Sequence, residues 1–330
     1  MRATARRRGA MPTRQVELTT RIGSITLPNP VMTASGTAGY GAELAPYLDL
    51  GGLGAVVVKS LAAFAWPGNA APRVHSSAAG MLNAVGLQGP GVDAWLRDEL
   101  PAVLRAGARV VASIWGRSVE EYRAAADLLA AAPSQVVAVE VNLSCPNLED
   151  RRHMFAHSAE ATRAAMEATA GCRRPRWAKL SPNTAALPEI AAAAQDGGAE
   201  AVTLINTLLG LALDPRTGLP VLGHGGGGLS GRAIHPVAVR AVFDVRAAWP
   251  NLPIVGVGGV AGGPDAAELL MAGANAVQVG TATFADPRAP AKVLAELEGW
   301  AARRGLDGIA DAVGVAHRGG LPRPGFGPPG

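Results

Sequence analysis

The stretch PIVGVGGVAGGPDAAELLMAGANAVQVGT, residues 253–281, decides the fold class. It contains a short apolar run from Pro253, an alanine- and leucine-rich segment over Pro264–Ala272, and a second apolar run from Ala276. Short, nearly continuous apolar runs are typical of strands covered on both faces, and a helix between two of them is typical of parallel βα units. The stretch therefore predicts a strand, a helix and a second, parallel strand.

The same alternation of apolar runs and alanine-rich helical stretches extends through most of the chain. Eight such units close an α/β barrel, in which helices surround a ring of parallel strands. We therefore predict an α/β protein with a (β/α)8 TIM barrel. The expected strands begin near Val31, Ala55, Arg109, Val136, Arg176, Ala201, Pro253 and Ala276, and helical stretches include Val119–Ala132, Ala159–Ala170, Pro264–Ala272 and Arg288–Arg303.

Further features sit around this barrel. Val16–Thr20 and Ser24–Leu27 flank Arg21-Ile-Gly23, which predicts a small N-terminal β-hairpin that plugs the barrel bottom. Two connections, 60–88 and 208–232, are long for a barrel and follow strand carboxyl ends, where barrels build their active sites. The expected domain limits are a flexible basic extension at 1–15, one barrel domain at 16–316 and a flexible Gly/Pro-rich tail at 317–330.

The net charge of +4 comes from the chain ends. Residues 1–14 contain five arginines and 317–330 contain two, with no acid in either, which leaves −3 for residues 15–316. A barrel of that charge, with scattered tryptophans, does not predict nucleic-acid binding. No apolar stretch predicts a membrane span or a signal peptide. The two cysteines, Cys145 and Cys172, are too few for a disulfide framework and show no metal-binding spacing, so we predict a cytoplasmic protein without a metal.

Glycines follow the last two predicted strands, as Gly258-Gly259 and as Gly280 before Thr281. Barrels hold phosphate groups at this place with backbone N–H groups, and glycine lets the main chain approach the anion. The alternative is that these glycines only form turns. The pattern by itself predicts a ligand that carries a phosphate group.

Lysines and amides also stand at strand ends, as Lys59, Lys179 and Asn206-Thr207. A lysine that faces a barrel interior is costly unless it meets an anion, although each lysine could instead extend to the rim and reach water. Together these residues indicate an anionic ligand, or a negative charge that develops during a reaction.

The fourth predicted strand ends in NLSCPN, residues 142–147, which places two amides and the Cys145 thiol around one turn. An asparagine amide both donates and accepts, which suits a ring with alternating N–H and C=O groups. A lone cysteine is more often a small buried apolar residue than a catalyst. Its place at the carboxyl end of a barrel strand favours a catalytic role for Cys145.

These motifs resemble class 1 dihydroorotate dehydrogenases over residues 16–316. The resemblance rests on NLSCPN at 142–147, GMLNAVGLQGPGVD at 80–93, and NTLLGLALD and PVLGHGGGGLSG within 206–231. Class 2 enzymes have serine in place of the cysteine and an N-terminal membrane helix. The GMLNAVGLQGPG and NTLLG segments are most similar to the class 1B catalytic subunit rather than to the fumarate-using class 1A.

The resemblance implies flavin-dependent oxidation of (S)-dihydroorotate to orotate in UMP biosynthesis. Cys145 would be the general base that removes the C5 proton while FMN N5 accepts the C6 hydride, and Lys179 would stabilise the reduced flavin ring. The implied FMN contacts are Ser35, Lys59, Ser60, Ser113, Asn142, Lys179, Ile205, Gly231, Gly258, Gly259, Gly280 and Thr281. The implied substrate contacts are Lys59, Asn83, Ala84, Val85, Gly86, Leu87, Asn142, Asn147, Asn206 and Thr207.

A class 1B enzyme would also have a partner subunit with FAD and an iron–sulfur cluster that passes electrons to NAD, and we expect a homodimer of this chain. The chain itself has no cysteine cluster and no dinucleotide-binding fingerprint. The thiol of a free cysteine has a pKa of about 8.5. The thiolate is the reactive form, so we expect turnover to rise with pH until Cys145 is ionised.

The match is weakest over Leu148–His157, an unusually charged segment that we interpret as a flap over the substrate. Ser60 stands where family members often have glycine. We interpret His153, His157 and His224 as loop residues and Cys172 as a structural residue.

Other functions remain open at this point. The NLSCPN region also resembles the pyrimidine-reducing domain of dihydropyrimidine dehydrogenases, which a substrate panel would separate. The tRNA-dihydrouridine synthases pair a barrel with FMN and a cysteine, but normally carry a basic RNA-docking domain. A barrel that binds a ligand without catalysis is the least favoured, because no expected catalytic position is missing.

Overall fold

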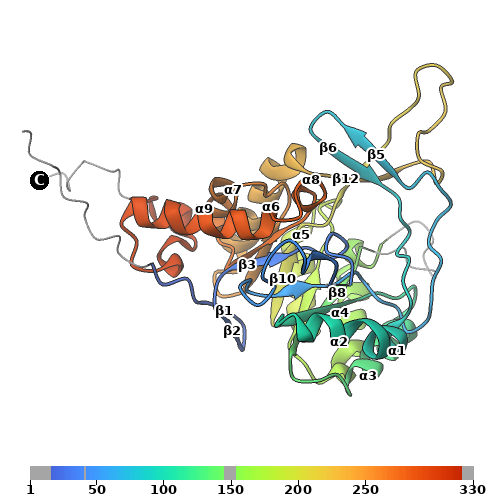
Figure 1. Ribbon diagram of the computed structural model, residues 1–330, viewed down its shortest axis with the longest axis horizontal. Helices are drawn as coiled ribbons and strands as arrows, with labels where there is room; N and C mark the ends of the chain where they lie inside the picture. Colours follow the sequence, from blue (N-terminus) through green and yellow to red (C-terminus); the bar gives the residue numbers. More distant parts are fainter. Residues whose placement is uncertain (1–15, 41, 145–153, 322–330) are drawn as a thin grey trace, which may run out of the picture.

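In the computed structural model, which describes residues 16–40, 42–144 and 154–321, eight parallel strands form a barrel (Figure 1). The order follows the chain, and the parallel bridge from Met32 to Ala55 joins the first strand to the second. All eight predicted strands are confirmed, as is the predicted fold class. They are β3 (Val31–Thr33), β4 (Val56–Val57), β7 (Val110–Ile114), β8 (Val136–Asn142), β9 (Arg176–Lys179), β10 (Ala201–Leu204), β13 (Ile254–Val257) and β14 (Ala276–Val279).

Helices surround this barrel. Ser118 and Ser158 cap two of them, because each hydroxyl accepts from a backbone N–H of the first turn, at 3.3 Å and 3.2 Å. The helices are α1 (Val92–Ala94), α2 (Leu100–Arg105), α3 (Val119–Leu129), α4 (Ala159–Ala168), α5 (Leu187–Asp196), α6 (His235–Ala248), α7 (Gly263–Ala272), α8 (Ala282–Ala285) and α9 (Ala289–Arg304). Short 3-10 turns include η3 (Phe155–His157), η4 (Thr169–Cys172) and η5 (Arg232–Ile234), and η2 (Trp95–Glu99) is a π-helical turn.

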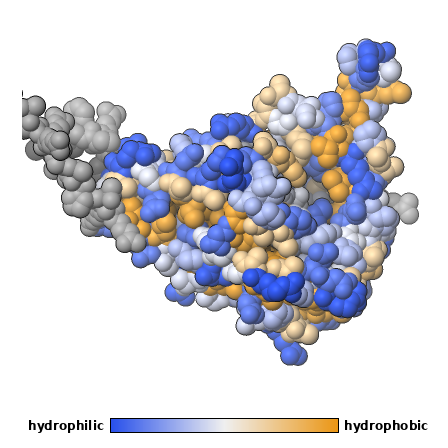
Figure 2. Space-filling view, in the orientation of Figure 1, coloured by the Kyte–Doolittle hydropathy of each residue, from blue (hydrophilic) through white to orange (hydrophobic). Residues whose placement is uncertain are grey.

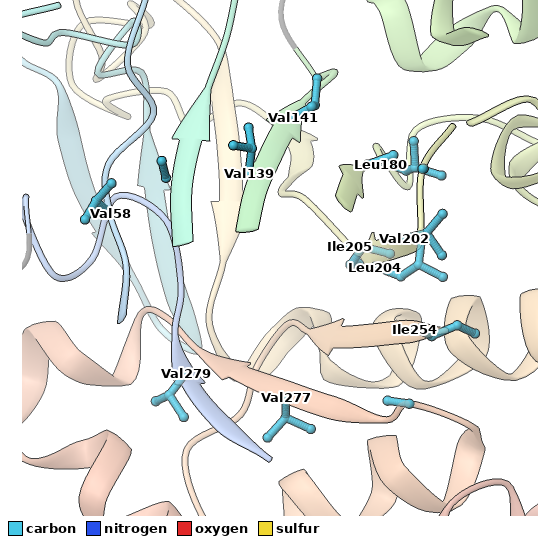
Figure 3. Packing of buried hydrophobic residues seen from close by; sticks show 14 of the residues in the cluster. Val58, Val139, Val141, Leu180, Val202, Leu204, Ile205, Ile254, Val277 and Val279 are labelled. Atoms are coloured by element: carbon cyan, nitrogen blue, oxygen red, sulfur yellow. The ribbon is translucent and has the colours of Figure 1, made fainter. Parts of the chain in front are cut away.

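The barrel strands are buried on both faces, as their apolar runs predict. On β14, Val277 and Val279 point to one side, toward the helices, where they join the main core cluster (Figure 3). The alternate residue Ala276 belongs to a second cluster with Met32, Trp177 and residues of the other strands. One cluster therefore packs helices onto the barrel, and the other fills the end of the barrel near the hairpin.

The predicted plug forms, but its strands are shifted along the chain. They are β1 (Thr20–Ile22) and β2 (Ile25–Leu27), so Arg21 and Ile22 lie in a strand rather than in the turn. The turn falls at Gly23, whose φ of 58° suits glycine, and Ser24, whose N–H and hydroxyl donate to the Glu200 carboxylate at 2.8 Å and 2.6 Å. Ile22 and Leu27 are buried in the second core cluster.

The two long connections were predicted as loops, and they instead contain a second sheet. Their strands are β5 (Val74–Ser77), β6 (Gly80–Asn83), β11 (Leu208–Gly210) and β12 (Gly227–Ser230), paired antiparallel in the order β11-β12-β6-β5. We call this the roof sheet. It projects beyond the barrel at the end opposite β1 and β2 (Figure 1). Backbone pairing of β12 with β6 joins segments that are far apart in the chain.

We expect Ile22→Ala to lower the free energy of unfolding by about 2–4 kcal/mol, because it removes buried methyl groups and leaves a cavity in the plug. Urea unfolding would measure this change. The control is Thr26→Ala on the exposed face of β2, for which we expect a change within about 0.5 kcal/mol. Equal effects of the two substitutions would contradict a plug that stabilises the barrel.

Candidate active site

A cavity of about 840 Å³ lies at the carboxyl ends of the barrel strands, beneath the roof sheet. Cavities of this size enclose cofactor-sized ligands. Residues that follow β3, β4, β8, β9, β10, β13 and β14 line it, together with parts of all four roof strands. Seven of the eight barrel strands thus contribute to one cavity.

The predicted phosphate-binding glycines lie together in this cavity. Gly259 has φ of 71°, and a Cβ there would lie 2.6 Å from the His235 Cβ, so only glycine fits. Beside them, the Thr281 hydroxyl donates to the Ser230 hydroxyl at 2.8 Å. Gly258, Gly259, Gly280 and Thr281, together with Ser230 and Gly231, form what we call the glycine cradle.

A chain of hydrogen bonds connects the polar residues at neighbouring strand ends. The Ser60 hydroxyl lies 3.1 Å from that of Ser35 and 2.8 Å from that of Ser113. The Asn142 amide donates to Ser60 at 3.3 Å and accepts from the Asn206 amide at 3.1 Å. This network fixes the orientation of both asparagine amides. Ser60 therefore contributes its side chain to this network.

The buried Lys179 ammonium has a carboxylate partner inside the barrel, which sequence reasoning missed. The Lys179 Nζ lies 3.5 Å from Glu140 Oε1, and both residues are buried. The other oxygen, Glu140 Oε2, accepts from Thr203 Oγ1 at 3.1 Å and from Gln278 Nε2 at 2.7 Å. A buried ion pair needs such additional hydrogen bonds to offset its desolvation. The only sequence signal was a single acid within the apolar run VVAVEVN.

The predicted substrate loop, residues 83–87, lines the cavity on the roof side. The Asn69 amide donates to the Ala84 carbonyl at 3.0 Å, and the Trp66 indole N–H donates to the Gly86 carbonyl at 2.9 Å. Leu87 has φ of 61°, which is uncommon for a residue with a side chain. The loop is held by side chains of the 60–88 connection itself.

Most sequence-predicted site residues thus share one cavity. Ser113 does not line it and instead lies behind Ser60, while Cys145 and Asn147 lie outside the described residues. Sequence reasoning missed several residues that follow strand ends or belong to the roof sheet. The predicted residues in the cavity are Ser35, Lys59, Ser60, Asn83, Ala84, Val85, Gly86, Leu87, Asn142, Lys179, Ile205, Asn206, Thr207, Gly231, Gly258, Gly259, Gly280 and Thr281, and the missed ones include Gly36, Asn69, Met81, Ser181, Asn183, Ser230 and Phe284.

The end of the predicted flap is anchored in the core. Phe155 and Ala156 are buried in η3, and the Phe155 ring packs edge-on against Tyr122 with ring centroids 5.2 Å apart. The Tyr122 hydroxyl donates to the Asn142 carbonyl at 2.6 Å. The part of the 148–157 segment that the structure describes, from Met154, is therefore tied to the strand that carries Asn142, and only Met154 of that part lines the cavity.

Metal sites and membrane spans were also sought in the described ranges. No group of three or more His, Cys, Asp or Glu residues there could hold a metal ion. No helix among the described residues is long and apolar enough to cross a membrane.

Comparison with known proteins gives consistent matches over nearly the whole chain. The family model described as dihydroorotate dehydrogenase matches residues 17–300. A protein of Desulforudis audaxviator named dihydroorotate dehydrogenase B (NAD(+)), catalytic subunit, is 46% identical over 305 residues, which cover 92% of this chain and 99% of the relative. Proteins of the same name from Geobacter metallireducens and Desulforamulus reducens are 41% and 42% identical, covering 91% and 92% of this chain and 98% and 99% of the relatives.

Cys172, interpreted from the sequence as structural, is buried at the end of η4. Its thiol donates to the Arg174 carbonyl at 3.6 Å. Burial raises the pKa of the Cys172 thiol, because the charged thiolate loses its hydration. A raised pKa leaves less thiolate at any pH below it, and the thiolate is the reactive form.

We therefore expect Cys172 to resist alkylation by iodoacetamide at pH 7–8 in the folded protein and to react fully in urea. Peptide mass spectrometry after timed labelling would measure both rates. Equally fast modification with and without urea would contradict the burial of this thiol.

Proposed function

The chain belongs to the dihydroorotate dehydrogenase family, and from this we propose that it is a class 1B catalytic subunit that oxidises dihydroorotate to orotate in pyrimidine biosynthesis. The observation that carries the proposal is the single cavity in which the glycine cradle and the Asn142–Asn206 amide pair come together. Cys145 follows Asn142 by three residues, which supports its assignment as the general base.

We propose FMN as the flavin. The glycine cradle suits a phosphate group, since a Cβ at Gly258 or Gly259 would meet neighbouring side chains and the backbone there is open toward the cavity. Lys179, buried and backed by Glu140, would hold a positive charge against the flavin ring. When bound, the flavin supplies the hydride acceptor.

The chain's own residues would orient the substrate and move its proton. The Asn142 and Asn206 amides, fixed by their mutual hydrogen bond, would match the N–H and C=O groups of the substrate ring. Lys59 would pair with the substrate carboxylate. The Cys145 thiolate would take the C5 proton as hydride leaves C6, so both bonds break on one oriented ring.

The proposed contact between Lys59 and the substrate carboxylate favours dihydroorotate as the substrate. Dihydrouracil and dihydrothymine, the substrates expected if the chain resembled a dihydropyrimidine dehydrogenase in function, lack the carboxylate. A panel of the three compounds tests the assignment. We expect turnover with dihydroorotate to exceed that with the other two by at least a hundredfold, roughly the value of a charge-assisted contact with the partly buried Lys59. Comparable turnover of dihydrouracil would instead support the alternative.

The proposal also includes a partner subunit and a homodimer of this chain. The relatives are named NAD(+)-dependent catalytic subunits, which supports a partner subunit through which electrons reach NAD. FAD and an iron–sulfur cluster are the cofactors that the class 1B resemblance implies for that subunit. A homodimer is supported by the roof connection, where Leu209, Leu211, Leu213 and Leu219 are exposed; Figure 2 shows apolar side chains on this projecting part. We propose a reducing cytoplasm, which would keep the Cys145 thiol free.

We expect Cys145→Ala to retain flavin but to lose at least about a hundredfold in kcat, and Cys145→Ser to be slow yet active, because general-base catalysis contributes about 10²–10⁴ in rate. Steady-state kinetics and the visible flavin spectrum would measure both effects. The matched control is Cys172→Ala, which removes the buried thiol and should keep near-parental kcat. Near-full turnover of flavin-loaded Cys145→Ala would refute the assignment.

The electron acceptor can be tested with the purified chain, using dihydroorotate with NAD, fumarate or a redox dye. We expect the chain alone to reduce the dye but not NAD, because it has neither a cysteine cluster nor a dinucleotide-binding fingerprint. Adding a candidate iron–sulfur and FAD subunit should enable NAD reduction. Efficient fumarate reduction by the chain alone would contradict the class 1B assignment.

A further inference from the structure

His235, which none of the preceding functional assignments uses, lies directly behind the glycine cradle. It is the first residue of α6, and its side chain is only 11% exposed. Its Nδ1 lies 2.8 Å from the Gly258 carbonyl oxygen, and its Nε2 lies 2.9 Å from Glu268 Oε2 on α7. Both ring nitrogens therefore have an oxygen partner at hydrogen-bonding distance.

These two partners are a backbone carbonyl oxygen and a carboxylate oxygen. A carbonyl oxygen only accepts, and an ionised carboxylate also only accepts, whereas a neutral imidazole carries a single N–H. The Glu268 side chain is 56% exposed, so water also solvates its charge. With an ionised Glu268, both contacts can be hydrogen bonds at the same time only in the doubly protonated ring.

Nearby arginines have carboxylate partners of their own. Arg240 lines the same small surface pocket as His235 and Glu268, but its Nε donates to Asp244 at 2.7 Å. The Arg232 Nη2 atom lies 3.9 Å from Asp265 Oδ2. These arginines thus contact Asp244 and Asp265, whereas Glu268 contacts His235.

The contact with Gly258 also sets the orientation of the cradle. In a trans peptide the C=O of one residue and the N–H of the next point in opposite directions. Because His235 holds the Gly258 carbonyl on its own side, the Gly259 N–H is directed away from His235. Gly259 itself lines the cavity, and His235 packs against the position that a Gly259 Cβ would occupy.

We propose that His235 is held as an imidazolium by Gly258 and Glu268, and that it makes the cradle selective for a phosphate-bearing flavin over the same flavin without phosphate. It is a positioning residue that acts through the Gly258-Gly259 peptide and through its charge. The proposal rests on the proposed flavin site and concerns which form of the flavin that site retains.

Binding of FMN and of riboflavin to the apoprotein tests the selectivity, because riboflavin lacks only the phosphate. In His235→Asn, the amide can still donate to Gly258 but carries no charge, and we expect FMN affinity to fall by about tenfold while riboflavin affinity stays within about twofold. In His235→Lys, a cation is restored, and FMN affinity should stay within about threefold of the parent. Flavin fluorescence titration would measure all affinities.

The control is His317→Asn, because His317 also bonds a backbone carbonyl, that of Ala272 at 3.0 Å, at a site that does not line the cavity. Neither flavin should lose affinity in this variant. Equal loss of FMN and riboflavin in His235→Asn would show a purely structural role and overturn the selectivity. An unchanged FMN affinity in His235→Asn, or a tenfold loss in His235→Lys, would also overturn it.

The charge itself can be observed without any flavin. In ¹⁵N NMR spectra of the apoprotein, assigned by comparison with His235→Asn, both ring nitrogens of His235 should show the shifts of protonated nitrogens at pH 7. One protonated and one bare nitrogen would overturn the imidazolium. If the apoprotein bound neither flavin, the proposed cofactor would fail while this measurement still decided the charge of His235.

Discussion

Closure of the barrel is the constraint on which the site depends. Once Met32 pairs with Ala55, all strands run parallel around a ring and their carboxyl ends meet at one rim. Polar groups that are scattered over most of the sequence then become neighbours, as Ser60, Asn142 and Asn206 show. At the opposite end, the hairpin containing Ile22 fills the interior with apolar side chains, so the ligand cavity is confined to the rim.

Charge inside the barrel is paired rather than isolated. Lys179 lies near Glu140, whose remaining oxygen is bound by Thr203 and Gln278. A lysine without this carboxylate would bear the full cost of desolvation. The ion pair thus allows the Lys179 cation to lie at the cavity. Hydrogen bonds from β10 and β14 fix the Glu140 carboxylate that pairs with it.

The sequence predicts the barrel well because strands buried on both faces leave continuous apolar runs, as at Val136–Asn142. It predicts the glycine cradle because only glycine tolerates the backbone of Gly259. It does not predict the roof sheet, since β12 reads GGLS and pairs through backbone groups with no side-chain pattern. Nor does it reveal Glu140 or Glu268 as partners, because spacing along the chain does not say which strand or helix a carboxylate will face. The predicted boundaries of the hairpin were wrong because Glu200, far along the chain, binds Ser24 and fixes the turn there.

The pairing of β6 with β12 has a consequence for synthesis of the chain. Asn83 pairs with Gly228, so the roof cannot close until the chain has been made past the sixth barrel strand. Ribosomes add about 5–20 residues per second, and long-range strand pairing waits for its partner. The 60–88 connection therefore remains for several seconds without β12, the strand that pairs with β6. The cavity has no lining from β13 and β14 until later still, so a nascent chain acquires a complete binding chamber only near the end of translation.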